Sequence, residues 1–237
     1  MTGSSPQEYV IEILVVDLQP EVRKAVEDWR ASANATPHSL NEIVRAWFAG
    51  FGPAVTAVLV NGPTVPADVL RVTLTVPRGA DQARAARANE QGIRHAQAGR
   101  LDRALVLFRE AVERWPFDAD YHRSRGQAAL ELGEIQEAED AFLAALRLHP
   151  RDWAGLTMLG NVHYAKGALQ LARSLHEQSL AVHESAYALA NLGGVLGKEG
   201  QIGAARALFE RALQLDPKYE KARVGLSVCD AYEHRIP

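Results

Sequence analysis

The sequence lacks most features that mark secreted, disulfide-bonded or membrane-spanning proteins. It has a single cysteine, Cys229, which excludes an intramolecular disulfide and fits a reducing compartment. The first ten residues, MTGSSPQEYV, contain no basic segment followed by an apolar core, so they do not resemble a secretory signal. The apolar runs are far shorter than the ~20 residues of a membrane-spanning helix. These absences predict a cytoplasmic protein without a membrane partner.

A strong charge of either sign is also missing. The formal net charge is −3, from 26 Lys and Arg against 29 Asp and Glu, and the two signs are scattered along the chain. There is no basic run and no cluster that mixes basic and aromatic residues, as nucleic-acid-binding surfaces require. The composition therefore predicts no nucleic-acid partner.

Sequence motifs for catalysis are absent as well. No phosphate-binding GxxxxGK[ST] loop, CxxC, HExxH or GxSxG occurs, and nothing points to a cofactor. Asp17, His38 and Ser39 could form a triad, but their spacing carries no signature, and capping of a helix accounts better for Ser39. We predict that the chain is not an enzyme, while an enzyme that uses its N-terminal region stays an alternative.

The sequence does contain an internal repeat. Glycine recurs at 92, 126, 160 and 193 and again at 99, 133, 167 and 200, and alanine recurs at 104, 138, 172 and 205. The steps between the first glycines are 34, 34 and 33 residues. A period of about 34 with this pattern is typical of a helix–turn–helix solenoid. The stretch resembles the tetratricopeptide repeat (TPR) family.

Each repeat is predicted to form two short helices with defined packing and ends. A glycine in mid-helix costs about 0.5–1 kcal/mol relative to alanine, so its recurrence at one phase predicts close approach of the paired helix. The second glycine suits the left-handed residue that ends the first helix. Four residues are predicted as N-caps of the first helices: Asp81, Asp118, Asp152 and Ser185.

The chain before the repeats has a different pattern. Residues 9–16 and 55–60 are β-rich and apolar, and residues 69–76 alternate apolar and polar side chains. Two helical segments, starting near Pro20 and Leu40, separate the first strand from the other two. The order β-α-α-β-β predicts a small α+β domain with both helices on one sheet face and a hairpin of the last two strands.

The predicted architecture therefore has two parts. Residues 1–80 form the α+β domain, and residues 81–237 form an all-α TPR superhelix, a right-handed α-solenoid. Its repeats span 85–118, 119–152, 153–185 and 186–219. A helix over 220–232 is predicted to cap the last repeat, with Ala222, Val224, Leu226 and Val228 as its apolar positions.

The resemblance also implies where a partner binds. In TPR proteins the first helices line a concave groove that holds a peptide or a partner's helix. The groove positions of this sequence are Asn89, Arg123, Gln127, Thr157, Asn161, Tyr164, Tyr187, Asn191, Lys198 and Lys221. Amide side chains can pair with a peptide backbone, and lysine or arginine can hold a carboxylate.

One branch of the family holds a partner's C-terminal carboxylate with a lysine, two asparagines, a second lysine and an arginine. Asn161, Asn191 and Lys221 match three of these positions, but Thr157 and Gly225 stand where two of the three cations should be. The asparagines are therefore interpreted as serving general recognition of a peptide backbone, or as simply polar surface.

Three histidines gather in the third repeat: His163, His176 and His183. His163 and His176 occupy phases where the family prefers aromatic core residues. We interpret them as buried neutral imidazoles. The alternative is a metal site, with Glu177 near in sequence, or a pH-sensitive joint.

The functional prediction is an adaptor that binds a segment of another protein in its TPR groove. Two alternatives stay open. One is a self-associating scaffold, a homo-oligomer formed through residues 1–77. The other is an enzyme or a metal- or pH-responsive regulator that uses the N-terminal domain or the histidines of the third repeat.

Overall fold

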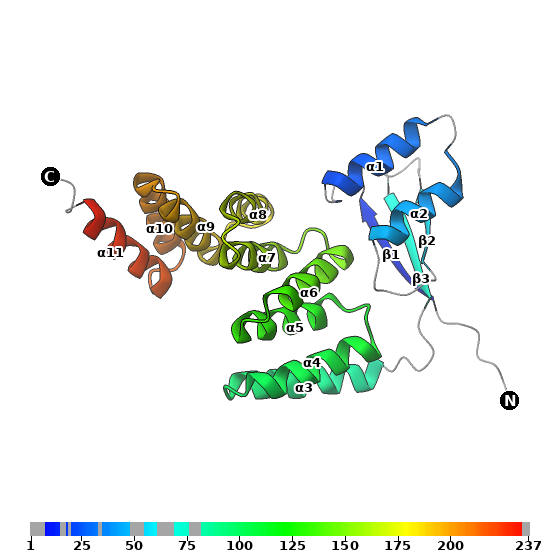
Figure 1. The fold of residues 1–237 in the computed structure, drawn as a ribbon, viewed down its shortest axis with the longest axis horizontal. Helices are drawn as coiled ribbons and strands as arrows, with labels where there is room; N and C mark the ends of the chain where they lie inside the picture. The colour runs from blue at the N-terminus through cyan, green and yellow to red at the C-terminus, as the bar shows by residue number, and fades with distance from the viewer. Residues whose placement is uncertain are drawn as a thin grey trace. The chain divides into compact units, whose positions relative to one another are not determined.

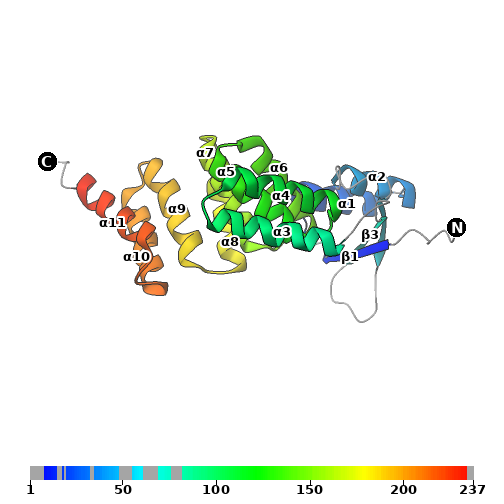
Figure 2. The same ribbon diagram turned by 90° about the horizontal axis from the view of Figure 1, so that it is seen from below.

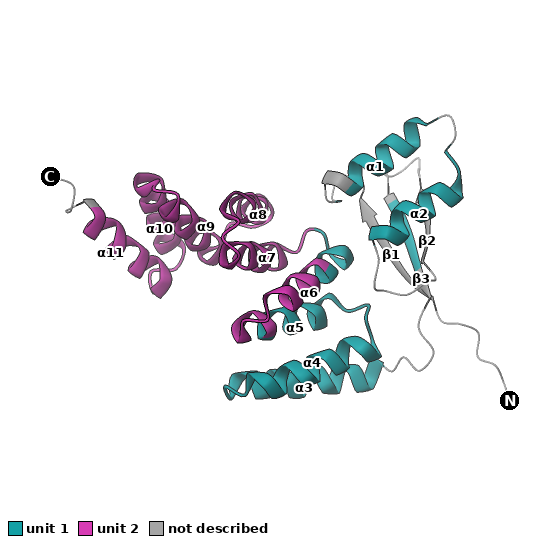
Figure 3. Ribbon diagram, in the orientation of Figure 1, with its two compact units in different colours: residues 1–128, 144–150 teal, residues 129–143, 151–237 magenta. Residues whose placement is uncertain are grey.

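The computed structural model describes residues 8–14, 18, 20–32, 35–47, 55–60, 69–75 and 82–233. Asp17 and Asp81, named above, lie outside these residues. The chain divides into two compact units, residues 1–128 with 144–150 and residues 129–143 with 151–237 (Figure 3). The domain boundary at residue 80 stays a prediction.

The first unit begins with five elements in the predicted order: β1 (Glu8–Leu14), α1 (Pro20–Ala31), α2 (Pro37–Trp47), β2 (Val55–Val60) and β3 (Val69–Thr75). The strands form an antiparallel sheet in the order β1-β3-β2. Thus β2 and β3 pair as expected, and β1 and β2 are the edge strands. Both helices lie on the same face of the sheet (Figures 1 and 2).

Many buried residues of the first unit belong to one apolar cluster. It includes Val26 of α1, Val44 of α2 and Val72 of β3, and it also includes Trp115 and Phe117, whose rings pack edge to face 5.5 Å apart. Both aromatic residues follow the second helix of the first repeat. The strand and helix segment thus shares its core with the start of the repeats.

The repeats are formed by eight helices. These are α3 (Gln82–Gln97), α4 (Leu101–Arg114), α5 (Ala119–Leu132), α6 (Ile135–Leu148), α7 (Trp153–Ala165), α8 (Leu169–Val182), α9 (Ala186–Lys198) and α10 (Ile202–Leu215). The turns at Gly99, Gly133, Gly167 and Gly200 have φ of +71°, +81°, +77° and +81°, as predicted. Only glycine adopts this conformation without a steric cost. A last helix, α11 (Glu220–Glu233), packs on α10 and α9 within the second unit (Figure 1).

The glycines in mid-helix have the predicted packing role. A Cβ atom added to Gly92 would lie 2.5 Å from Cε1 of Phe108, and one added to Gly193 would lie 2.8 Å from Cε1 of Phe209. At Gly160 the equivalent neighbour is the His176 ring, with Cε1 at 2.5 Å. Each ring therefore occupies the space that a side chain would need.

Three of the predicted N-caps are confirmed. The Asp152 carboxylate accepts a hydrogen bond from the Ala154 N–H at 3.1 Å, and the Ser185 hydroxyl accepts one from the Ala188 N–H at 3.2 Å. The Asp118 carboxylate accepts from the Asp120 N–H at 2.9 Å. These bonds satisfy N–H groups that lack partners within the helix.

Within the residues that the structure describes, no helix is both long enough and apolar enough to cross a membrane.

Candidate functional site

Three contacts connect the first helices of the third and fourth repeats with the last helix. The Asn161 amide of α7 donates to the Tyr187 hydroxyl of α9 at 2.8 Å. The Lys198 ammonium of α9 lies over the Tyr164 ring of α7, 4.7 Å from its centroid. The Lys221 ammonium of α11 donates to the Asn191 side-chain oxygen of α9. We call this surface the α7–α9–α11 face, defined by Asn161, Tyr164, Tyr187, Asn191, Lys198 and Lys221.

The helical spacing explains why these side chains meet. Residues three, four or seven positions apart share one side of a helix. This relation holds for Asn161 and Tyr164 on α7, and for Tyr187, Asn191 and Lys198 on α9. Since α9 contacts both α7 and α11, its side chains reach both neighbours. All six residues were predicted groove positions, and the structure brings them together.

The centre of this face is largely preorganised by internal hydrogen bonds. Asn191 is 4% exposed, and its amide N–H also donates to the Tyr187 carbonyl oxygen at 2.8 Å. The Tyr187 hydroxyl donates to the Met158 sulfur at 3.2 Å. Burial raises the pKa of Tyr187, and hydrogen bonds from Asn161 and Asn191 oppose that shift. Tyr187 therefore stays neutral and holds the two asparagines in place.

Asn161 keeps an acceptor for an incoming group. Its amide nitrogen is engaged by Tyr187, whereas its side-chain oxygen has no hydrogen-bond partner in the described part of the chain. A backbone N–H of a bound segment could donate to that oxygen.

The two lysines give the face positive charge. In the described ranges neither Lys198 nor Lys221 has a carboxylate partner; their contacts are the Tyr164 ring and the Asn191 oxygen. Lys166 differs, because Glu139 neutralises it at 2.7 Å. Desolvation lowers the pKa of Lys221, so a partner's carboxylate would gain from pairing with this ammonium.

Thr157 is a correction to the predicted groove. It is fully buried, and its hydroxyl lies 2.7 Å from the Ser179 hydroxyl and 3.0 Å from the Trp153 carbonyl oxygen. The Ser179 hydroxyl donates to the same carbonyl at 2.7 Å. Thr157 therefore joins α7 to α8 and cannot contact a partner.

The remaining predicted groove residues belong to the first unit. Arg123 forms an ion pair with Asp120 of its own helix at 2.7 Å, and Gln127 is exposed. Asn89 is partly buried; in the described ranges its side-chain oxygen has no partner. The binding roles of Asn89, Arg123 and Gln127 stay predictions.

The structure also reveals three exposed apolar residues on α11. Val224, Val228 and Tyr232 are 53%, 61% and 49% exposed, and the residues that pack toward α10 are Ala222 and Cys229. The four apolar positions named for this helix thus divide between two sides: Ala222 and Leu226 pack in the core of the second unit, whereas Val224 and Val228 are exposed. Residues two apart lie about 200° apart around a helix, and this spacing could have separated the two faces from sequence.

The three histidines of the third repeat have separate environments. His176 is fully buried, and neither of its ring nitrogens has a hydrogen-bond partner among the described residues. Burial, assisted by the charge of Lys221, lowers its pKa to about 4. His163 lies 3.6 Å from Glu139, and burial is the main cause that lowers its pKa. The exposed His183 packs against Trp153, with ring centroids 4.9 Å apart.

These environments favour buried neutral imidazoles at His163 and His176. Glu177, the suggested third metal ligand, forms an ion pair with Arg173 at 2.8 Å. The described part of the chain contains no group of three or more His, Cys, Asp or Glu residues that could hold a metal ion.

The suggested triad in the N-terminal region finds another explanation. Thr36 and Ser39 cap α2 reciprocally: the Ser39 N–H donates to the Thr36 hydroxyl at 3.2 Å, and the Thr36 N–H donates to the Ser39 hydroxyl at 3.1 Å. The N-cap is thus Thr36, with Ser39 three residues into the motif. His38 faces Glu42 at 3.3 Å.

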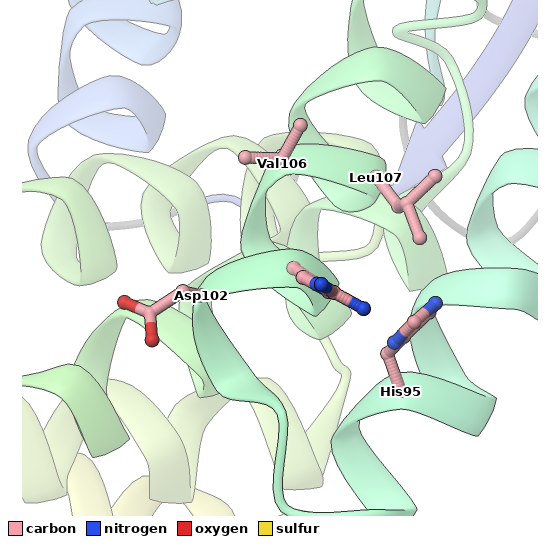
Figure 4. Close-up of a pocket in the computed structure, with 5 residues that line it drawn as sticks. His95, Asp102, Val106 and Leu107 are labelled. Carbon is pink, nitrogen blue, oxygen red and sulfur yellow. The ribbon is translucent and has the colours of Figure 1, made fainter.

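An open pocket of about 400 Å³ lies on α3 and α4 in the first unit (Figure 4). It is lined by His95, Asp102, Arg103, Val106 and Leu107. His95 already accepts a hydrogen bond from Arg100 at 2.9 Å. The predicted groove residues do not line this pocket, which we interpret as surface relief of the helix pair.

Paired helices, glycine turns of left-handed conformation and aromatic rings packed on mid-helix glycines define an all-α helical-repeat protein. The family comparison identifies the repeat. The tetratricopeptide repeat matches residues 89–152, 126–188 and 186–219, so the matches extend from 89 to 219, more than half of the chain. The chain belongs to the tetratricopeptide repeat family, and no family covers its N-terminal region.

Similar proteins are much longer or only distantly related. The chain is 34% identical over 108 residues to Protein CTR9 homolog of Arabidopsis thaliana and 28% identical over 127 residues to BBSome complex member BBS4 of Xenopus tropicalis. These matches cover 45% and 51% of this chain but only 10% and 23% of those proteins.

Two solved structures share the fold. PilF of Pseudomonas aeruginosa has a TM-score of 0.58 at 23% identity, covering 66% of this chain and 72% of that one. MamA of Desulfovibrio magneticus RS-1 has a TM-score of 0.55 at 22% identity, covering 64% and 86%. At this identity the likeness establishes the fold alone.

Proposed function

We propose that the protein is an interaction module that binds a segment of a partner protein on the α7–α9–α11 face. The observation that carries this proposal is the set of three contacts that join Asn161 to Tyr187, Tyr164 to Lys198, and Asn191 to Lys221. They form one polar and aromatic surface across three helices. Its members are fixed before binding, which reduces the entropy lost when a partner is ordered.

Each kind of side chain on this face has a different task. The free Asn161 oxygen accepts a hydrogen bond from the partner's backbone, while Lys198 and Lys221 attract its acidic groups. Asn191 and Tyr187 act mainly by positioning Lys221 and Asn161. The arrangement does not support a clamp for a C-terminal carboxylate, since buried Thr157 replaces one cation of that constellation.

Affinity capture with purified intact chain as bait tests the proposal. Asn161→Ala combined with Lys198→Gln should lose a partner that the parent retains, because the free acceptor and one cation disappear. Gln170→Ala, an exposed amide on α8, is the matched control and should retain it. Equal recovery of the partner by all three baits would contradict the assignment to this face.

Asn191 needs a separate variant because it is buried. Asn191→Ala removes the acceptor of Lys221 and should weaken capture if positioning of that lysine matters. Circular dichroism checks that the helices persist. A folded Asn191→Ala protein with unchanged partner affinity would remove Asn191 from the mechanism.

A second candidate function is self-association through residues 1–77, which we propose form part of a separate α+β domain over 1–80. The observation that favours it is the sheet order β1-β3-β2, which places β1 and β2 at the edges. Edge strands present backbone groups that can pair with another chain. Light scattering of the intact chain over a range of concentrations tests this idea. A monomer at every concentration would contradict it.

A further inference from the structure

The helix α11 carries an exposed apolar surface that a cap does not require. Of the seven large apolar side chains that are exposed among the described residues, three are on this one helix: Val224, Val228 and Tyr232. Their spacing of four residues places them in one row, and Lys221 extends the row by three residues. We call these four residues the α11 stripe. Scattered exposed apolar residues need no explanation, whereas a contiguous row marks an interaction surface.

The α11 stripe continues into the α7–α9–α11 face. Lys221, its first member, donates to Asn191 of α9. Gly194 lies three residues beyond Asn191 on the same side of α9, and an added Cβ there would meet nothing within 4 Å. The middle of α9 thus has open space at Gly194. A bulky apolar side chain of a partner could fill that space.

The charges beside the stripe indicate which sign of charge a partner should carry. Lys221 lies at its beginning, and Lys198 follows Gly194 by four residues on α9. As noted, neither ammonium has a carboxylate partner among the described residues. The acidic residue next to the stripe, Glu220, is paired with Arg223 of the same helix, and Asp230 of α11 is paired with Arg206 at 2.6 Å. An acidic partner would therefore be attracted and a basic one repelled.

We propose that the α11 stripe and Gly194 bind an acidic amphipathic helix of a partner protein. Its apolar side chains, one turn apart, pack on Val224, Val228 and Tyr232, and its glutamate or aspartate side chains pair with Lys198 and Lys221. A helix fits because the apolar row runs from Val224 to Tyr232, eight residue steps or about 12 Å along α11, and rows of side chains at this spacing pack between the rows of a second helix. This inference rests on the proposed function and specifies its ligand.

The test uses three fluorescent synthetic helices of about 18 residues, long enough to form a helix in water, and fluorescence anisotropy with the intact chain. The first has leucine on one face and glutamate on the other, the second has lysine in place of glutamate, and the third has serine in place of leucine. The first should bind at least about tenfold more tightly than either of the others. Similar affinity for the acidic and basic helices would overturn the proposal, as would no binding of the first.

Substitutions in the protein assign the binding to the stripe. Val224→Ser combined with Val228→Ser should weaken binding of the leucine–glutamate helix about tenfold or more, because two apolar contacts are lost. Val106→Ser is the matched control, since Val106 is 60% exposed on α4. Serine and valine have similar helix propensities, so α11 should remain folded, which circular dichroism verifies. Equal binding by the double variant and the control would overturn the proposal.

The lysines are tested through salt dependence. Lys198→Gln with Lys221→Gln should weaken binding and flatten its dependence on salt, because screening acts on the lost charge pairs. Lys218→Gln, an exposed lysine outside the stripe, should behave as the parent. An unchanged salt dependence in the double variant would overturn the acidic character of the ligand.

Two further outcomes separate this inference from the proposed function. Capture of a partner that depends on Asn161 but not on Val224 and Val228 would leave the proposed function standing and overturn the α11 stripe. Light scattering tests whether the stripe instead binds a second copy of the chain. A dimer that becomes a monomer on Val224→Ser/Val228→Ser would overturn the acidic-helix assignment.

Discussion

Replacement of His176 by phenylalanine should make the protein more stable and less sensitive to acid. His176 is fully buried against Gly160, and both of its ring nitrogens lack hydrogen-bond partners in the described ranges. Phenylalanine occupies the same phase at 108 and 209, where its ring packs equally closely on glycine. The third repeat thus holds a polar ring in a site shaped for an apolar one.

The gain at neutral pH follows from the cost of an unsatisfied buried polar group, about 1–3 kcal/mol by mutational estimates. Phenylalanine removes that cost, and the fit of Phe108 against Gly92 at 2.5 Å shows that such a ring suits this geometry. Some adjustment of the larger ring will reduce the gain. We expect His176→Phe to raise the free energy of unfolding by about 1–2 kcal/mol at pH 7.5.

The acid response has a definite sign. The pKa of His176 falls from 6.5 to about 4 in the folded protein, because of burial first and the charge of Lys221 second. Between these values the unfolded chain binds a proton that the folded chain does not, so stability is present above pH 6.5 and is lost as the pH falls toward 4. At pH 5 this histidine should lower the free energy of unfolding by about 2 kcal/mol relative to neutral pH. That loss disappears in the phenylalanine variant.

Urea unfolding followed by circular dichroism at pH 7.5 and pH 5 measures both effects. The difference in free energy of unfolding between the variant and the parent should be about 2 kcal/mol larger at pH 5 than at pH 7.5. His122, whose pKa is also lowered to about 4 by burial, is present in both proteins, so its contribution cancels in the comparison. The exposed His149 gives a control variant, His149→Phe, without this widening. A His176→Phe protein that is less stable at pH 7.5 and parallels the parent at pH 5 would refute the reasoning.

Other substitutions and one exchange experiment test the packing of the second unit. Gly160→Leu should lower the free energy of unfolding by about 1–3 kcal/mol or more, because its Cβ would meet His176. Gly194→Ala should instead raise the free energy of unfolding by about 0.5–1 kcal/mol. Urea unfolding measures both changes, and equal effects of the two substitutions would contradict the packing argument. Thr157→Val should lower the free energy of unfolding by about 1–2 kcal/mol, because it removes a hydrogen-bond partner of Ser179. It should leave capture of the partner unchanged. Weaker capture by the folded variant would show that Thr157 does belong to the binding groove. Hydrogen exchange should be faster in α7 and α8 than in α9 and α10, since the unsatisfied imidazole of His176 destabilises the third repeat. Slower exchange in α7 and α8 than in α9 and α10 would refute this prediction.

Local features of the repeats could be predicted because they depend on nearby residues. Gly99 and Gly167 end their helices in the left-handed conformation, and Asp152 and Ser185 cap the next ones. These outcomes require only backbone sterics and a side chain within three residues of a free N–H. The 34-residue period then specified that the helices pair, so the family and the helix order followed from sequence.

The candidate site was predictable only in outline. The helical phase placed Asn161, Tyr164, Asn191 and Lys221 on related faces, but it gave no means to see that Asn161 is bonded to Tyr187 of α9 and Asn191 to Lys221 of α11. Such contacts join residues of different helices, and their partners depend on how those helices pack.

The sequence alone thus determined the helices, their turns and the repeat to which they belong, because backbone conformation and helical periodicity are local properties. Tertiary structure decided which positions of each helix are covered. Thr157 is buried because α8 supplies Ser179 beside it, and Val224 and Val228 are exposed because α10 packs on the opposite side of α11. A helix offers side chains all around its axis, and only its neighbours determine which of them remain free to bind a partner.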